Sequence, residues 1–433
     1  MPGTNPAPSE TDGLGRIDNP DTIEMPDAFY ADIRGKCPVR HEEGIGWLIS
    51  RYHDVRSMAL NTKEFSSSIA GEEGPRHMGV GTEPLSEEVE GLLAQYHPMD
   101  NALFTADPPK HTRHRALVNK GLNPRRVRSL EGKMREISED LVDGFIADGH
   151  CELHTQFGIG LPLTVIADTL GVERKDMPEF KYWSDCMLAG NLDVLDNTRR
   201  AEIARAVIDF QQYFIPRIES RRKEPQDDLL SDLANAEIED GDLDGEATGP
   251  RNLTTAELLP IVSQILLAGN ETTTNLIGNG LVILIRNPEI MAEVRGQFSL
   301  IPGFVEEVLR FDGPIHCTFR RTMDDVEVDG EVIPGDSMVV PVWGSANKDP
   351  EVFDQPEKFD IHRRNARRHL TFGVGPHFCV GAEMARLEAK VGFETLLTRL
   401  DNIRLKDDAG LAHYPSFSAR GFQRIDIEFD PAG

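Results

Sequence analysis

Cysteine is scarce in this chain of 433 residues, which has only Cys37, Cys151, Cys186, Cys317 and Cys379. Their number is odd and their spacing matches no disulfide framework, so we expect a reducing, cytoplasmic environment. The chain also has few basic residues: 73 acidic residues against 46 lysines and arginines give a net charge of −27. Since phosphate groups bind to basic surfaces, we expect neither nucleic acid nor an anionic membrane as a main partner.

Long hydrophobic runs are missing as well. The stretch that comes nearest to a membrane span, residues 276–285, covers ten residues, whereas a bilayer requires ~20. The first ten residues hold neither the basic nor the apolar region of a signal peptide. We expect residues 1–25 to be a disordered lead. No linker rich in Pro, Gly and Ser interrupts residues 26–433, which are expected to form a single domain and a monomer.

Helical periodicity is what the sequence has in abundance, and its longest example starts at residue 254. Thr254 and Glu257 fit a capping box, in which the two side chains satisfy free backbone amides at a helix start. Apolar residues then recur every three or four positions as far as Ile285, and Pro288 ends the pattern. About thirty residues at 1.5 Å per residue give a helix of ~45 Å. Such a helix, apolar on most sides, is expected to cross the core.

The other predicted elements are shorter. Helical periodicity dominates residues 111–235, and strand patterns occur at 46–52, at 326–340 as a hairpin, and at 424–429. The stretch 70–100 is rich in Gly, Glu and Pro and is expected to be a long loop. We therefore predict a mainly α protein with small β-sheets, an α+β fold.

Cys379 lies in the stretch Phe-Gly-Val-Gly-Pro-His-Phe-Cys-Val-Gly, residues 372–381. Its glycine spacing differs from that of a dinucleotide loop, a phosphate loop would need Gly-Lys-Ser/Thr, and zinc would require more cysteine or histidine ligands. His377 could serve as the base for a nucleophilic cysteine, so a thiol hydrolase stays open on these residues alone. A thiolate that binds haem iron explains the glycines better, because they let the backbone approach a flat cofactor closely.

Three segments of the chain share the features of one family. Residues 372–381 fill every fixed position of the haem-binding signature F-G-x-G-x-H-x-C-x-G. Residues 268–272, Ala-Gly-Asn-Glu-Thr, match A-G-x-[DE]-T, and residues 307–310, Glu-Val-Leu-Arg, match E-x-x-R. In this order they resemble the bacterial form of the cytochromes P450, the soluble haem-thiolate monooxygenases. The resemblance implies a fold in which a long central helix crosses haem b, and insertion of one oxygen atom of O2 into an apolar small molecule.

The resemblance also assigns roles to residues of the cysteine loop and the long helix. Cys379 would be the axial ligand of the haem iron. Other residues of its loop are expected to contact the cofactor: Phe372, Gly373 and Gly381. Ala268 and Gly269 would let the long helix pass close over the haem. Thr272 would hydrogen-bond to the dioxygen that is being reduced, and Glu271 would relay protons to it from solvent.

Basic and acidic side chains elsewhere receive structural or cofactor-binding roles from the same resemblance. The groups expected to bind the haem propionates are His111, Arg115, Arg320 and His377. His111 and Arg115 belong to a segment similar to D-P-P-x-H-x-x-x-R, and Arg320 is preferred to the adjacent Arg321 because it follows Pro314 by six residues. The ion pair of Glu307 and Arg310, joined by Arg363, would lock the loop that carries the cysteine.

The substrate pocket is expected to be largely apolar. Its predicted lining is Val262, Ile265, Ala268, Ile315, Thr318 and Phe417. Such a lining suits a terpenoid, a steroid or an aromatic hydrocarbon. Since the chain has no flavin or iron–sulfur segment, electrons from NAD(P)H are expected through a ferredoxin reductase and an acidic iron–sulfur ferredoxin. The predicted docking face consists of Arg125, Arg126, Arg128, Arg363, Arg364, Arg367 and Arg368.

Two alternatives use the same cofactor. The first is an H2O2-driven peroxygenase, which Glu271 and Thr272 disfavour because peroxide supplies its own protons. The second is a non-catalytic haem sensor or carrier, which predicts no substrate-dependent consumption of NAD(P)H with any redox partner.

Overall fold

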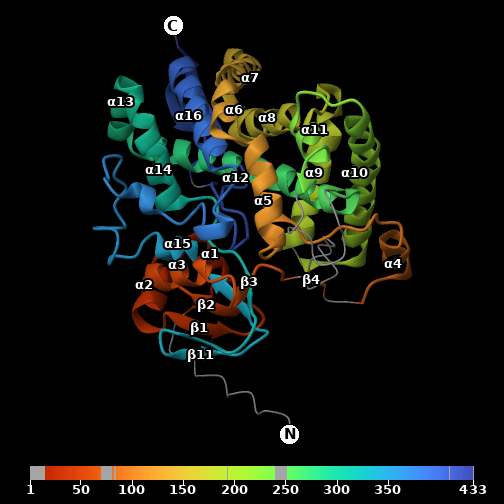
Figure 1. Cartoon of the computed structure of the whole chain (residues 1–433). Helices are drawn as coiled ribbons and strands as arrows, with labels where there is room; N and C mark the ends of the chain where they lie inside the picture. The colour runs from red at the N-terminus through yellow and green to blue at the C-terminus, as the bar shows by residue number, and fades with distance from the viewer. Residues whose placement is uncertain are drawn as a thin grey trace.

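Helices make up most of the molecule, and the strands collect in small sheets (Figure 1). The computed structural model describes residues 15–69, 80–81, 84–192, 194–238, 251–408 and 410–432. The helices are α1 Pro20–Glu24, α2 Pro26–Lys36, α3 Tyr52–Leu60, α4 Glu87–Leu93, α5 Lys110–Gly121, α6 Pro124–Ser129, α7 Glu131–Asp143, α8 Gly160–Leu170, α9 Met177–Leu192, α10 Asn197–Lys223, α11 Leu229–Ala234, α12 Thr255–Arg286, α13 Pro288–Gly296, α14 Ile301–Asp312, α15 Trp343–Ala346 and α16 Ala382–Arg399. The strands are β1 Val39–Glu42, β2 Gly46–Ile49, β3 Phe65–Ser66, β4 Val80–Gly81, β5 His150–Glu152, β6 Val194–Leu195, β7 Glu237–Ile238, β8 Arg251–Asn252, β9 Arg320–Thr322, β10 Val326–Val328, β11 Glu331–Ile333, β12 Met338–Pro341, β13 Leu400–Leu405 and β14 Asp426–Pro431. The predicted mainly α fold with small sheets is confirmed.

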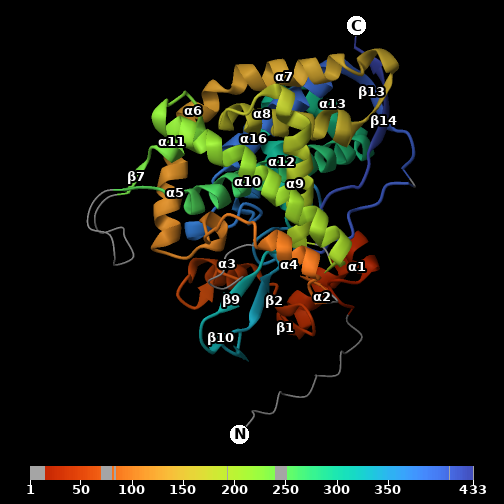
Figure 2. The same ribbon diagram turned by 90° about the vertical axis from the view of Figure 1, so that its right-hand side faces the viewer.

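Helix α12 runs through the middle of the molecule, with other helices around it (Figure 1, Figure 2). Its 32 residues begin at the predicted capping box, where the Glu257 N–H donates to Thr254 Oγ1 at 3.2 Å and the Thr254 N–H donates to the Glu257 carboxylate at 2.8 Å. The first half is buried in one hydrophobic cluster with α9 and α10, and the second half in another with α14 and α16. No helix of the described ranges, α12 included, is long and apolar enough to cross a membrane.

The largest sheet has the strand order β1-β2-β12-β9-β3 and lies beside α2 and α3, at the end of the molecule opposite α7 and α16 (Figure 1). Strand β12 pairs with β2 in parallel, and the other neighbours are antiparallel. The predicted hairpin is formed by β10 and β11 alone. Its turn residues Asp329 and Gly330 have φ of +50° and +82°, as a two-residue hairpin turn requires. Strand β9 of the five-stranded sheet carries Arg320.

The ordered part of the chain begins closer to the N-terminus than expected. Residues 1–25 were predicted to be disordered, yet α1 occupies Pro20–Glu24 and Ile17 is 1% exposed. The Glu24 carboxylate accepts the His413 N–H at 3.1 Å and lies 2.7 Å from His413 Nδ1. The ordered part therefore starts before residue 26, because partners almost four hundred positions away hold it. Residues 1–14 lie outside the described residues.

Two other boundaries differ from the predictions. The expected loop at 70–100 contains α4, whose start is capped by Ser86 Oγ accepting the Val89 N–H at 3.3 Å; residues 70–79 and 82–83 are outside the described part of the chain. The strand expected at 46–52 ends at Ile49. The Asp349 carboxylate accepts the Tyr52 N–H at 2.9 Å, and this long-range contact starts α3 there.

Candidate active site

Cys379 is presented by a loop that turns sharply before α16. Gly373 and Gly375 have φ of +68° and +76°, a conformation that residues with a side chain rarely adopt. The Cys379 N–H donates to the Phe372 carbonyl at 2.8 Å and closes the loop. The sequence therefore places glycine where the backbone needs left-handed geometry to turn around the thiol.

The surroundings of the Cys379 thiol are suited to a metal-bound thiolate. Burial raises the pKa of Cys379, whereas a hydrogen bond from the Gly381 N–H and the charges of Arg115 and Arg386 lower it. The N–H and both guanidinium groups thus stabilise negative charge on sulfur, which is what a thiolate ligand of iron requires. Val380, the next residue, packs against the hydrophobic cluster that includes the first half of α12.

The middle of α12 interrupts an otherwise buried helix. Ala268 is exposed, and Gly269, Glu271 and Thr272 are half-buried, although the residues on either side are almost entirely enclosed. Thr272 Oγ1 donates to the Ala268 carbonyl at 2.7 Å. An exposed alanine and a half-buried glycine leave little side-chain bulk on this stretch, and the carboxylate and the alcohol lie at its end. A flat group can therefore lie close to the helix beside two side chains that exchange protons.

Four basic side chains form a cluster from three separate segments. The rings of His111 and His377 have centroids 3.9 Å apart. Burial, together with the charges of Arg115, His114 and Arg320, lowers the pKa of His111 to about 4. Burial and the charges of His111, Arg320 and Arg115 lower the pKa of His377 to about 3. Burial also lowers the pKa of Arg320. The cluster has the chemistry of a receptor for anions.

The partners of this basic cluster leave room for a dicarboxylate. His111 Nδ1 is buried without a hydrogen bond, and His377 Nε2 lies 3.1 Å from Ser67 Oγ. Arg320 donates to its neighbour's carbonyl, that of Phe319, at 2.7 Å. Among the described residues, none of the four basic groups forms an ion pair with a carboxylate. Because the guanidinium groups of Arg115 and Arg320 require anions and the neutral histidine rings can donate hydrogen bonds to carboxylates, the two propionates of a haem fit this set.

The choice between two adjacent arginines follows from their contacts. Arg321 forms an ion pair with Asp336 on the exposed side of β9. Arg320 is instead among the charges that act on His111 and His377. Arg320 is thus the member of the pair that belongs to the basic cluster.

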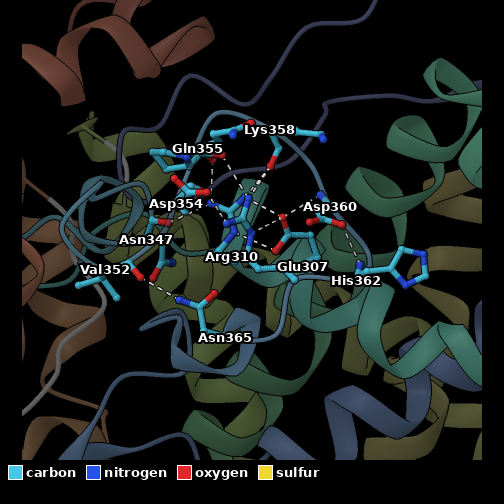
Figure 3. Close-up of polar contacts among 12 residues, drawn as sticks. Glu307, Arg310, Asn347, Val352, Asp354, Gln355, Lys358, Asp360, His362 and Asn365 are labelled. Carbon is cyan, nitrogen blue, oxygen red and sulfur yellow. Dashed lines mark hydrogen bonds and ion pairs between the residues drawn. The ribbon is translucent and has the colours of Figure 1, made fainter.

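Glu307 and Arg310 are brought together in the interior (Figure 3), and Arg363 joins them. Glu307 and Arg310 are fully buried and form a two-pronged ion pair with both contacts at 2.8 Å. Arg363 Nε reaches the same carboxylate at 3.0 Å, as does the Asp360 N–H. The two guanidinium groups also donate to backbone carbonyls of Asn347, Asp354, Gln355, Pro356 and Lys358. The carboxylate thus fixes the chain that leads into the cysteine loop.

The predicted pocket residues lie in different environments. Ala268 is exposed, and Ile315, Thr318 and Phe417 are half-buried. Ile265, 6% exposed, lies about 60° from Ala268 around the helix. Val262 exposes no surface and does not reach the same side, because six residues of helix turn it about 120° away from Ala268.

Two further residues lie near α12: Phe104 belongs to the loop around 85–104, which the sequence predicts to line the pocket, and Glu388 was not predicted. Phe104 is 49% exposed, and its N–H donates to Gln264 Oε1 of α12 at 3.3 Å. Glu388 in α16 is 3% exposed, and burial raises its pKa to about 8. For Glu388 a signal existed, since a carboxylate among the apolar positions of a helix is unusual.

Comparisons with known proteins agree with this geometry. Residues 175–409 match the family model for cytochrome P450. The chain is 35% identical to the cytochrome P450 monooxygenase PikC of Streptomyces venezuelae over 99% of this chain and 96% of that one. It is 33% identical to the vitamin D(3) 25-hydroxylase of Pseudonocardia autotrophica, covering 94% of each. Cytochrome P450 CYP109Q5 from Chondromyces apiculatus superposes with a TM-score of 0.82 at 36% identity, over 96% of this chain and 98% of that one.

The matched family model and these relatives define a haem-dependent oxidoreductase. The chain belongs to the cytochrome P450 family. Its cofactor is haem b, and it is a monooxygenase that uses O2, external redox partners and a small-molecule substrate.

Proposed function

We propose that Cys379 is the axial ligand of the haem iron and that the stretch from Ala268 to Thr272 forms the floor of the oxygen and substrate site. The interruption of burial in α12 carries this proposal. When bound, the haem supplies the iron at which dioxygen is reduced. Ala268 and Gly269 admit the macrocycle close to the helix. The loop residues Phe372, Gly373 and Gly381 would contact the cofactor beside Cys379.

Glu271 and Thr272 deliver protons in this proposal. Thr272 Oγ1, which now donates to the Ala268 carbonyl, can rotate its hydroxyl toward the haem side and donate a hydrogen bond there. The Glu271 carboxylate takes a proton from solvent and passes it toward the Thr272 hydroxyl. General acid catalysis by such positioned groups contributes on the order of 10²–10⁴ in rate.

The basic cluster binds the propionates, and the carboxylate of Glu307 holds the loop. His111, Arg115, Arg320 and His377 neutralise the two carboxylates of the cofactor. Arg310 and Arg363, both bound to Glu307, keep the chain before Cys379 rigid. Together these contacts would hold the haem and keep the Cys379 loop in place beside it.

The substrate is an apolar molecule of the terpenoid, steroid or aromatic class. The predicted lining supports this, since exposed Ala268 and Phe104, half-buried Ile315 and buried Ile265 carry no charge. The relative named vitamin D(3) 25-hydroxylase favours a steroid-like skeleton as the first compound to test. The experiment is a screen of such compounds for the spectral change that accompanies displacement of the distal water. A screen in which only charged or strongly polar compounds bind would overturn this assignment.

Electrons are delivered by a ferredoxin that docks on exposed arginines. Arg363 is held by Glu307, and Arg126 pairs with Asp232. The arginines that remain exposed are Arg125, Arg128, Arg364, Arg367 and Arg368. An acidic iron–sulfur protein suits them, and its association is expected to weaken with salt. We place the enzyme in the cytoplasm as a monomer, in keeping with five cysteines that form no disulfide.

Two measurements test the proposal. A carbon monoxide difference spectrum of the reduced protein is expected to show the thiolate-type band; its absence in folded, haem-loaded protein refutes the role of Cys379. Reversal of Arg364 and Arg368 to glutamate is expected to slow ferredoxin-supported turnover and flatten its salt dependence. Reversal of Arg404 and Arg424, exposed near β13 and β14, is the control. Faster turnover with peroxide than with ferredoxin would favour a peroxygenase.

A further inference from the structure

Glu306, the neighbour of Glu307, is the centre of a second buried charge cluster. Its carboxylate is 3% exposed and accepts from Arg386 Nε at 2.7 Å and from Arg386 Nη2 at 3.3 Å. On its other side His369 Nε2 lies at 3.1 Å. Arg367 Nε approaches to 3.5 Å from the surface, with a side chain that is 76% exposed. The adjacent glutamates of α14 therefore bind different sets of cations.

The charge states in this cluster are defined by hydrogen bonds. The Thr371 N–H donates to His369 Nδ1 at 3.2 Å, so His369 Nε2 carries the proton and donates to Glu306. Burial acts to raise the pKa of Glu306, but the hydrogen bonds from His369 and Arg386 outweigh it and lower the pKa to about 2. Glu306 is thus an anion held against the guanidinium of Arg386.

Arg386 connects this cluster to the cysteine loop. Its guanidinium carbon lies 4.7 Å from the centroid of the Phe372 ring. The His369 ring centroid lies 5.6 Å from the same ring. Phe372 accepts the Cys379 N–H, and Arg386 is one of the cations that lower the pKa of Cys379. One side chain of α16 therefore contacts the wall of the loop and acts on the sulfur through its charge.

We propose that Arg386 and Glu306 are positioning residues that set the electron donation of Cys379 to iron, Arg386 by its charge and its contact with Phe372, Glu306 by holding Arg386 and opposing its charge. This inference rests on the proposed role of Cys379 as the iron ligand. A positive charge near a thiolate withdraws electron density and favours the reduced metal, so the reduction potential of the iron reports it directly.

The experiment compares three variants of the haem-loaded enzyme by spectroelectrochemical titration. Arg386→Gln removes the cation and is expected to lower the reduction potential. Glu306→Gln removes the opposing anion and is expected to raise it. Glu383→Gln is the matched control, because Glu383 also accepts from Arg386, at 3.2 Å, but its side chain is 65% exposed. It is expected to leave the potential near that of the parent enzyme.

The outcomes separate an electrostatic role from a structural one. Opposite shifts for Arg386→Gln and Glu306→Gln support the proposal, whereas shifts of the same sign, or shifts no larger than that of Glu383→Gln, overturn it. If Arg386→Gln does not fold, Arg386→Lys keeps the charge and loses the contact with Phe372. Its reduction potential is then expected to equal that of the parent enzyme or to lie below it. A rise as large as that of Glu306→Gln overturns the proposal. A parent enzyme without the thiolate-type carbon monoxide band would refute the role of Cys379 instead.

Discussion

The Glu388 carboxyl group of α16 is buried against α12, where it hydrogen-bonds to Thr273. Thr273 is the residue that follows Thr272 of the acid–alcohol pair. Burial raises the pKa of Glu388 to about 8, so the group is protonated in the folded enzyme at neutral pH. In the unfolded chain it ionises near its ordinary pKa of about 4.5.

This difference in pKa predicts that Glu388→Gln stabilises the protein in a pH-dependent way. A folded pKa above the unfolded one means that stability is present at low pH and is lost as pH rises between about 4.5 and about 8. The loss is about 1.4 kcal/mol per pH unit in that window, so the variant is expected to gain on the order of 3 kcal/mol over the parent at pH 7. Urea unfolding at pH 5 and pH 8 measures it, with exposed Glu383→Gln as control. An equal difference at both pH values contradicts the prediction.

Removal of the Glu307 charge is expected to destabilise the fold strongly. Glu307→Gln leaves Arg310 buried without its anion, which costs about 3–5 kcal/mol in the free energy of unfolding. Asp336→Asn removes the partner of Arg321 in an exposed pair and is expected to cost less than about 1 kcal/mol. Chemical denaturation of both variants makes the comparison. Similar losses for the two would show that burial of the pair around Glu307 adds nothing.

Arg320 and Arg321 are expected to differ in haem retention. Arg320→Leu removes one cation from the basic cluster, at a cost of about 2 kcal/mol or about thirty-fold in haem affinity. Arg321→Leu breaks a surface contact with Asp336 and is expected to leave haem content unchanged. The ratio of haem to protein after purification, and the rate of haem transfer to an acceptor globin, measure both. A greater loss of haem from Arg321→Leu than from Arg320→Leu would show that Arg321 is the residue that binds the cofactor.

Thr272→Val is expected to uncouple NAD(P)H consumption from product formation. The substitution keeps shape and removes the hydroxyl, so product turnover should fall on the order of 10² while haem binding is retained. Thr398→Val on α16 is the matched control, because Thr398 makes the same bond to the carbonyl four residues earlier, at 2.7 Å, on an exposed face. Product formed per NAD(P)H consumed is the measurement. Full coupling in Thr272→Val would remove this threonine from the proposed proton route.

Features that depend on neighbours in the sequence could be predicted, and those that depend on distant partners could not. The capping box at Thr254, the hairpin turn at Asp329 and the glycines beside Cys379 act over a few residues. The order of the chain before residue 26 depends on the contact of Glu24 with His413, and the start of α3 depends on Asp349. The same holds for the charge cluster of Glu306, whose partners lie 63 and 80 residues away.

The continuity of α12 also limits how this chain can vary. Its cap at Thr254 and its exposed stretch at Ala268 belong to one uninterrupted helix. One inserted residue between them would rotate everything beyond it by about 100° and advance it by about 1.5 Å. Ala268 would then turn into the hydrophobic core, and the buried Leu267 would take its exposed position. Length changes among related enzymes should therefore accumulate in the loops, while the number of residues from the cap to Thr272 stays constant.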